Sequence, residues 1–265
     1  MKITTLMDDT LSGENLHAEH GLSLYIETEK HKILADTGQS SLTWENARTL
    51  GIDLTAVDTV FLSHGHYDHS GGILSFMKNN LQANLFMHRN AGGEYYSFKE
   101  NSEHYIGIDK EILKNPRIKL ISEDTVIDDE LSIFTNISCK RKIPKGNFRL
   151  HKREGEKYAQ DDFSHEQYLV CKYDNSKLAL ISGCAHKGIL NITDRFREIY
   201  KKDPDMVVSG FHMIQNEYND DDIDEIKNTA CELLKMNTVF YTGHCTGDFA
   251  YSILKEIMGD KLFHI

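Results

Sequence analysis

The strongest constraint on this chain is a cluster of metal-ligand side chains directly after an apolar segment. Residues 60–62, Val-Phe-Leu, are typical of a short buried strand, and the cluster that follows comprises His64, His66, Asp68 and His69. Gly65, Gly71 and Gly72 allow the tight backbone turns that such a cluster needs. Imidazole nitrogen combined with carboxylate oxygen suits zinc, iron or manganese. The pattern therefore predicts a metal site on a loop at the end of a strand.

The spacing of these side chains divides them between two ions. In an extended segment alternate side chains share a face, so His64 and His66 can point to one metal. Asp68 and His69 lie beyond the bend and can reach a second metal. The alternative is a polar surface loop that is histidine-rich by chance, but the flanking glycines and the strand-end position favour the metal site.

The composition limits the kinds of partner that the chain can have. Its 265 residues carry a formal net charge of −11, which argues against duplex nucleic acid as a partner. No apolar run reaches the roughly 20 residues of a membrane helix, and residues 1–6 lack the apolar core of a secretory signal. The five cysteines are odd in number and include no C-x-x-C pair, which suits a reducing compartment. We expect a cytoplasmic protein without nucleic-acid or membrane partners, and homo-oligomer formation stays open.

The order of the expected elements indicates an α/β fold. Only three prolines and no low-complexity tract are present, so we expect a single domain over residues 1–265, with a variable, more polar insertion at about 90–160. Apolar alternation predicts strands at 2–7, 22–27, 32–35, 58–62, 85–87, 168–173, 178–182, 206–209 and 238–241. Helical spacing predicts helices at 42–50, 72–80, 188–200, 223–235 and 248–258. This order predicts two sheets packed together with helices outside.

The motif H-x-H-x-D-H at residues 64–69 resembles that of the metallo-β-lactamase superfamily. Further similar segments are Ile33 to Gly38 (ILADTG), Ile181 to His186 (ISGCAH), Tyr241 to Gly247 (YTGHCTG), His20 to Ser23 (HGLS) and Ser209 to His212 (SGFH). Together they resemble the subgroup labelled 7,8-dihydropterin-6-yl-methyl-4-(β-D-ribofuranosyl)aminobenzene 5′-phosphate synthase. The match covers residues 1–85 and 160–250 well. It implies an αβ/βα sandwich of two mixed β-sheets flanked by helices, with the metals at one edge between the sheets.

The resemblance also implies a set of metal ligands. His64 and His66 match ligands of the first metal, and Asp68, His69 and His244 match ligands of the second.

The chain departs from the superfamily pattern at two positions. A further histidine of the superfamily falls near Asp162 here, and the metal-bridging aspartate falls near Cys184. His186 could supply the missing nitrogen to the first metal. Cys184 is either a bridging or second-site thiolate ligand or, equally, a small buried residue at a strand end.

Some side chains near the motif invite other roles. His212 follows a buried strand, and substrate contact or general acid catalysis is weighed evenly against a structural role. Asp36 is expected to orient the histidine segment by hydrogen bonds rather than to bind metal. The basic stretch from Lys140 to Arg153 could lie over the site and attract a phosphate or carboxylate, although most charge runs are solvated faces. The histidines without such context are treated as surface or core residues: His17, His31, His88, His104, His151, His165 and His264.

These observations lead to a functional hypothesis. Two divalent metal ions, expected to be zinc with iron or manganese as alternatives, would hold a hydroxide that Asp68 orients for attack. The substrate would be a small anionic molecule, with phosphate- or pterin-bearing compounds as candidates and a phosphoester as the favoured bond. Three alternatives stay open: a di-iron redox protein, although such members usually carry glutamate at the position of His66; a nonenzymatic metal- or ligand-binding module; and a nuclease, which the acidic balance disfavours.

Overall fold

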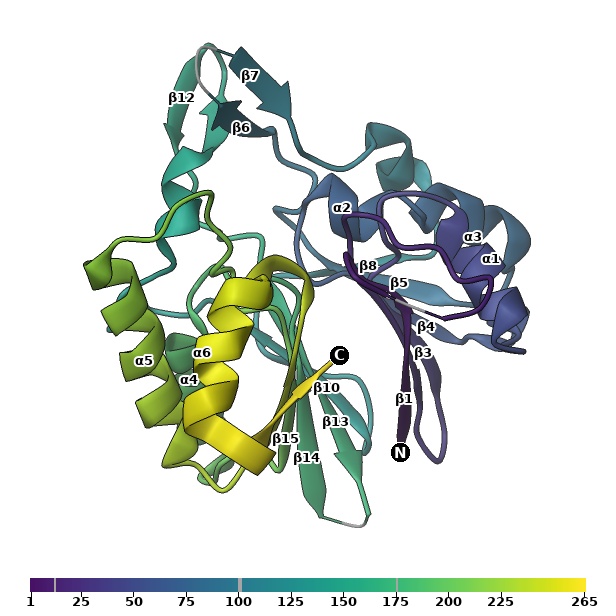
Figure 1. Ribbon diagram of the computed structural model, residues 1–265. Helices are drawn as coiled ribbons and strands as arrows, with labels where there is room; N and C mark the ends of the chain where they lie inside the picture. The colour runs from purple at the N-terminus through teal and green to yellow at the C-terminus, as the bar shows by residue number, and fades with distance from the viewer. Residues whose placement is uncertain (12, 100–101, 175) are drawn as a thin grey trace.

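The computed structural model describes residues 1–11, 13–99, 102–174 and 176–265, and the strands in these ranges form three sheets (Figure 1). The first sheet has the order β1 (Lys2–Met7), β2 (Ser23–Glu27), β3 (Lys32–Ala35), β4 (Thr59–Phe61), β5 (Asn84–His88), β8 (Ile118–Ile121). The second has the order β17 (Leu262–His264), β16 (Val239–Thr242), β15 (Met206–Val208), β14 (Lys177–Ile181), β13 (Gln167–Tyr173), β10 (Leu131–Thr135), β9 (Thr125–Val126). The third and smallest has the order β12 (Lys157–Gln160), β11 (Leu150–Glu154), β6 (Tyr95–Lys99), β7 (Ser102–Tyr105).

The two large sheets pack face to face and are covered by helices on their outer sides (Figure 1). On the side of the first sheet lie α1 (Leu42–Thr49), η1 (Leu54–Ala56), α3 (Ile73–Asn79) and η2 (Lys110–Lys114). The second is covered by α4 (Ile189–Tyr200), α5 (Asp220–Leu234) and α6 (Asp248–Met258), after which η5 (Gly259–Lys261) leads into β17. None of the helices in the described ranges is long and apolar enough to span a membrane.

Alternation along single strands explains this layering. In β3, Ile33 and Ala35 belong to the core between the sheets, whereas Leu34 belongs to the core under α1 and α3. In β13, Leu169 faces the central core and Val170 packs toward α4. Because both faces are buried in their central parts, residues 33–35 of β3 and residues 168–171 of β13 are apolar without interruption. The predicted sandwich of two mixed sheets flanked by helices is confirmed.

Two expectations about local structure need correction. Asp68 and His69 do not lie on a loop but on the short helix α2 (Tyr67–Ser70), which is too short to give a recognisable helical pattern. The range 90–160 is also more ordered than its polarity suggested. It holds the small sheet, while β8 and β10 from the same range pair within the large sheets.

The strand directions explain why one edge of the sandwich collects polar side chains. β3, β4 and β5 are parallel, and so are β14, β15 and β16. The carboxyl ends of parallel strands meet at one edge of a sheet, which is where α/β sheets usually bind ligands. The segments that follow β4, β14 and β16 carry the histidine motif, Cys184 and His244. The small sheet lies over this end of the molecule (Figure 1).

His31, in the turn between β2 and β3, gives the fold a pH-dependent contact. Its Nδ1 lies 2.8 Å from Asp58 Oδ1 and its Nε2 lies 2.6 Å from Asp128 Oδ2. Burial lowers the pKa of His31, but the two carboxylates outweigh it and raise the pKa above 6.5. A raised histidine pKa adds stability that is present below the unfolded value and lost as the pH rises through the folded value.

We therefore expect His31→Gln to lower the free energy of unfolding by roughly 1 kcal/mol at pH 6 and by less at pH 9. Urea unfolding of both proteins at the two pH values measures this difference. An equal loss at both values would contradict the assignment.

Candidate metal centre

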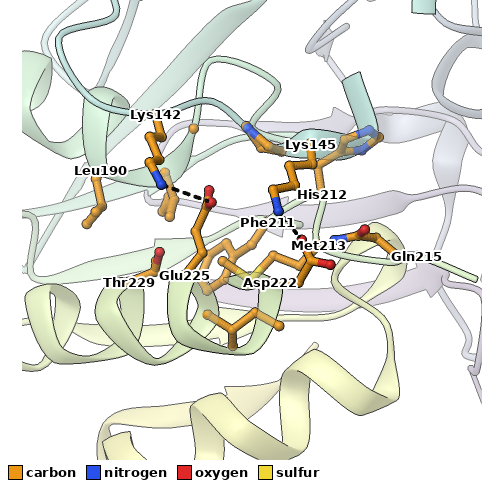
Figure 2. Close-up of a pocket in the computed structure, with 14 residues that line it drawn as sticks. Lys142, Lys145, Leu190, Phe211, His212, Met213, Gln215, Asp222, Glu225 and Thr229 are labelled. Atoms are coloured by element: carbon orange, nitrogen blue, oxygen red, sulfur yellow. Dashed lines mark hydrogen bonds and ion pairs between the residues drawn. The ribbon is translucent and has the colours of Figure 1, made fainter. Parts of the chain in front are cut away.

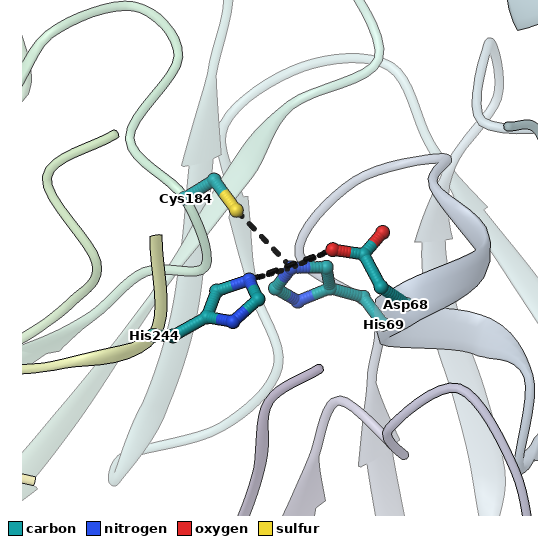
Figure 3. A group of neighbouring side chains, drawn as sticks. All are labelled: Asp68, His69, Cys184 and His244. Atoms are coloured by element: carbon teal, nitrogen blue, oxygen red, sulfur yellow. Dashed lines mark hydrogen bonds and ion pairs between the residues drawn. The ribbon is translucent and has the colours of Figure 1, made fainter. Parts of the chain in front are cut away.

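Two groups of buried donor atoms converge at the edge between the large sheets, and they share one sulfur. One group consists of Asp68, His69, Cys184 and His244, and the other consists of His64, Cys184 and His186. Within each group the donor atoms all lie within 4.8 Å of one another. Figure 3 shows Cys184 and His244, from the second sheet, pointing toward Asp68 and His69 from α2. The arrangement provides two adjacent positions at which a cation could bind.

The hydrogen bonds of His69 and His244 leave a lone pair on each ring aimed at the other. His69 Nδ1 donates to Asp36 Oδ2 at 2.7 Å, and His244 Nδ1 donates to Asp9 Oδ1 at 2.6 Å. In a neutral imidazole the second nitrogen is then an acceptor. These two acceptor atoms, Nε2 of each ring, lie 3.2 Å apart, and His69 Nε2 is also 3.2 Å from Cys184 Sγ. Acceptor atoms this close together repel one another unless a cation binds between them, so the arrangement fits a shared cation.

His64 and His186 are also held so that their Nε2 atoms face each other. Ser63 Oγ gives its proton to Asp36 Oδ2 at 2.7 Å and can therefore accept from His64 Nδ1 at 2.9 Å. His186 Nδ1 donates to the Asn147 side-chain oxygen at 2.9 Å, because the Asn147 amide nitrogen already donates to the His186 carbonyl. The two Nε2 atoms face each other at 3.4 Å. Burial lowers the pKa of both rings well below 6.5, which keeps their nitrogens available as donors to a metal.

His66 adjoins this second group. Its ring centroid lies 4.6 Å from that of His64 and 5.0 Å from that of His186. Burial lowers its pKa to about 3, and its buried Nε2 has no hydrogen-bond partner among the described residues. A buried, unpaired imidazole nitrogen is costly unless something binds it. His66 also shares a donor group with Asp161 and His165.

The electrostatics of Asp68 and His244 favour a positive charge between them. Asp68 Oδ2 lies 3.4 Å from His69 Nε2 and 3.5 Å from both His244 Nε2 and His20 Nε2. Burial would raise the pKa of Asp68, but these imidazoles lower it, and the carboxylate is ionised. Burial lowers the pKa of His244, yet the hydrogen bonds with Asp68 and Asp9 raise it well above 6.5, so that without a bound cation Nε2 carries a proton, which a metal ion would displace. The position beside this carboxylate is therefore suited to a cation.

Three non-glycine residues of the site have a left-handed backbone conformation, which is typical of functional sites. Asp36, His212 and His244 all have positive φ angles of 56°, 50° and 47°. Non-glycine residues adopt this conformation at a cost, and it clusters where function requires it. Gly183 lies against Ser63 and His64 so closely that a Cβ there would overlap the Ser63 hydroxyl. The segment before Cys184 can approach the histidine motif only because residue 183 has no side chain.

His212 and Cys245 lie beside the shared sulfur. Their donor atoms and that of Cys184 form a third buried group within 4.8 Å. Both ring nitrogens of His212 are buried and have no partner among the described residues. His212 also lines the cavity above the metal centre, so it is available to a molecule bound there.

That cavity has a volume of about 350 Å³, within the range of small-molecule sites. Its floor carries Asp68, Cys184, His186 and His244, whereas Lys99, His104 and Arg149 belong to its other walls. The site is therefore buried but open to a ligand from one side.

The structure brings the residues of the sequence hypothesis together at one edge of the sandwich. Asp162, which falls near the position of a further superfamily histidine, is half exposed and pairs with Lys152, and it belongs to none of the donor groups. Asp36 makes the expected hydrogen bonds to the motif, to Ser63 and His69.

Sequence reasoning missed four residues that support the centre. Asp9 bonds to both His20 and His244, and His20 in turn faces Asp68. Buried His165 accepts a hydrogen bond from the Gly65 amide at 2.9 Å and bonds to Asp161. The His20-Gly21 segment was noted only as part of the resemblance, and the i, i+4 spacing of Asp161 and His165 was the one available signal for that pair.

The chain is similar in sequence and in fold to known proteins. Residues 18–130 match the sequence model of the metallo-beta-lactamase superfamily. The chain is 31% identical to 7,8-dihydropterin-6-methyl-4-(beta-D-ribofuranosyl)-aminobenzene-5'-phosphate synthase of Methanocaldococcus jannaschii, over 97% of this chain and 91% of that protein. An uncharacterized protein of the same organism is 28% identical over 99% of this chain and 97% of its own length. The crystal structure of Tm1679, a metal-dependent hydrolase of the beta-lactamase superfamily, superposes with a TM-score of 0.82 at 31% identity, covering 99% of this chain and 95% of that one.

Proposed function

Because the chain belongs to the metallo-β-lactamase superfamily, we propose that it is a dinuclear metal-dependent hydrolase that acts on a small anionic substrate, with a phosphoester as the favoured bond. The observation that carries this proposal is the pair of donor groups that meet at Cys184. Superfamily membership supports an enzyme of this general kind, and the geometry of this chain supports the number of ions and the ligands.

The donor atoms fit divalent transition metals. His64, His66 and His186 would hold the first ion, Asp68, His69 and His244 the second, and Cys184 would lie between them. Burial raises the pKa of the Cys184 thiol, so a neighbouring cation is what would hold it as a thiolate. Nitrogen with thiolate and a single carboxylate favours zinc, with iron and manganese as alternatives.

Bound divalent ions would polarise the scissile group and lower the pKa of water toward about 7. The protein residues would do the rest. Asp68 is ionised and would fix the second ion and orient the attacking water. Asp36 and Asp9 hold the rings of His69 and His244 in the tautomers that expose Nε2. His212, with both nitrogens buried at the cavity, would protonate the leaving group as it departs.

A substrate panel tests the proposal. Protein purified without added metal is assayed with bis(4-nitrophenyl) phosphate, an aryl phosphate monoester, an aryl lactone, a thioester and pterin phosphates. We expect turnover of at least one phosphoester, its loss on treatment with a chelator and its return with zinc. Bound metal without turnover of any of them would favour a nonenzymatic binding module. Visible iron absorption with oxygen reduction would instead favour a di-iron redox protein.

A group transfer on the same site is the second candidate, because the relative from Methanocaldococcus jannaschii is named a synthase. In that case the acceptor would be a carbon or nitrogen nucleophile rather than water. Product analysis in oxygen-18 water separates the two: hydrolysis places the label in a product, whereas transfer to another acceptor does not.

A further inference from the structure

The basic stretch from Lys140 to Arg153 divides into two kinds of residue. Six of its side chains form ion pairs: Lys140 with Glu198, Arg141 with Asp194, Lys142 with Glu225, Lys145 with Asp222, Lys152 with Asp162, and Arg153 with Glu94. Figure 2 shows two of them, in which Lys142 and Lys145 point toward carboxylates of α5. These six are an ordinary paired surface.

Arg149 differs from the other six. It lies at the end of η3 (Lys145–Arg149), and within the described ranges it forms no ion pair with a carboxylate. Arg149 also lines the cavity over the metal centre, together with its neighbour Leu150. An exposed guanidinium that lines a cavity without a partner is available to a ligand.

The register of the small sheet brings two more basic side chains to the same wall. Ser97 in β6 pairs with Leu150 in β11 on one side and with His104 in β7 on the other. Directly paired residues project to the same face of a sheet, and so do residues two apart in a strand. Lys99, two residues after Ser97, therefore shares this face, and all four residues line the cavity.

The charge of the cavity is opposite to that of the chain. The protein carries a net charge of −11, yet among the described residues that line this cavity Asp68 is the one carboxylate. Asp68 lies against the imidazoles of the donor groups rather than against Lys99 or Arg149. Lys99 likewise forms no ion pair within the ranges that the structure describes, so its ammonium and the Arg149 guanidinium are both free to bind an anion.

We propose that Lys99, His104 and Arg149 form an anion subsite that binds the non-reacting end of the substrate. The ligand class is a molecule with two ends: a scissile group at the metal centre and an anionic oxygen-bearing group, phosphate monoester or carboxylate, at the subsite. This proposal rests on the proposed function for the reacting end. Arg149 would bind two oxygens of the anion through its planar guanidinium, and Lys99 would add a point charge.

The test measures binding without requiring turnover. Metal-loaded protein is titrated calorimetrically with alkylphosphonates of two to six methylenes and with matched compounds that end in a carboxylate or a phosphate. The phosphonate is not hydrolysed and occupies the metal end. At the best chain length we expect the terminal anion to strengthen binding about 10-fold or more, as charged hydrogen bonds do. The larger gain among the two end groups identifies which anion the subsite prefers.

Variants assign the effect to the residues. Lys99→Gln combined with Arg149→Gln should remove most of that gain while binding of the plain alkylphosphonates stays within about 2-fold, which also shows that the site is intact. The matched control, Arg48→Gln with Lys119→Gln, removes the same charge from exposed positions outside the cavity and should keep the gain. No gain at any chain length, or an equal gain in the Lys99 and Arg149 variant, would overturn the subsite. If the substrate panel showed no turnover, the hydrolase proposal would be wrong, but the calorimetric titration would still test the anion subsite because it measures binding alone.

Discussion

Replacing Asp68 by alanine should lower kcat/KM for the best phosphoester by about 10³-fold or more and remove one bound metal ion per chain. The reason is the position of this carboxylate. Its Oδ2 faces the Nε2 atoms of His69, His244 and His20 at 3.4 to 3.5 Å. Without it, the donor group of His69, Cys184 and His244 loses its carboxylate oxygen and the negative charge that favours a cation there. Steady-state kinetics and elemental analysis of the same preparation measure both effects.

Asp162→Asn is the matched control for that variant. Asp162 is a carboxylate that falls near the position of a superfamily histidine, and it pairs with Lys152 outside the donor groups. Its replacement should change kcat/KM by less than about 3-fold and leave the metal content unaltered. If Asp68→Ala kept its full metal content and activity, the assignment of the second ion would be wrong.

Replacing Cys184 by serine should have the second-largest effect, a loss of about 10- to 100-fold in metal affinity together with a comparable loss of activity. Cys184 is the one residue that the two donor groups share. Its sulfur lies 3.2 Å from His69 Nε2, so the change affects both ion positions at once. Competition with a chromogenic chelator measures the affinity, and cobalt-substituted protein should lose its sulfur-to-metal charge-transfer absorption.

Cys245→Ser provides the comparison for Cys184. Cys245 is equally buried and lies next to Cys184, with its thiol directed to the Cys184 carbonyl at 3.6 Å, but it shares a group with His212 rather than with the histidine motif. We expect its variant to keep the charge-transfer absorption and both ions. If that absorption persisted in Cys184→Ser and vanished in Cys245→Ser, the roles of the two cysteines would be exchanged.

Much of the fold could be predicted from the sequence because its core strands carry strong signals. Ile33 to Ala35 and Leu169 to Cys171 are buried on both faces, and such strands are recognised by their continuous apolar character. Two strands of the small sheet carried no such signal. All residues of β7 and β12 are exposed, so they show neither an apolar run nor alternation. Their order comes from pairing with β6 and β11, which a single sequence does not reveal.

In the candidate site, too, some residues could be predicted from the sequence and others could not. The motif at residues 64–69 predicted a metal centre because its ligands are close in the chain. The hydrogen bond from His244 to Asp9 joins residues 235 positions apart, and the contact between Gly65 and His165 joins residues 100 apart. Nothing local marks Asp9 for this role, and the i, i+4 spacing from Asp161 is the one local signal for His165. The outer hydrogen bonds that fix the ring tautomers therefore became visible only in the folded chain.

Side chains from distant segments of the chain should bind a shared pair of cations. Elemental analysis of the full chain, purified without added metal and then equilibrated with zinc and desalted, measures the number of ions bound. We expect about two equivalents of divalent transition metal per folded chain, as in other dinuclear sites. A folded protein that retains no metal after this treatment, with its thermal unfolding unchanged by zinc or chelator, would contradict it.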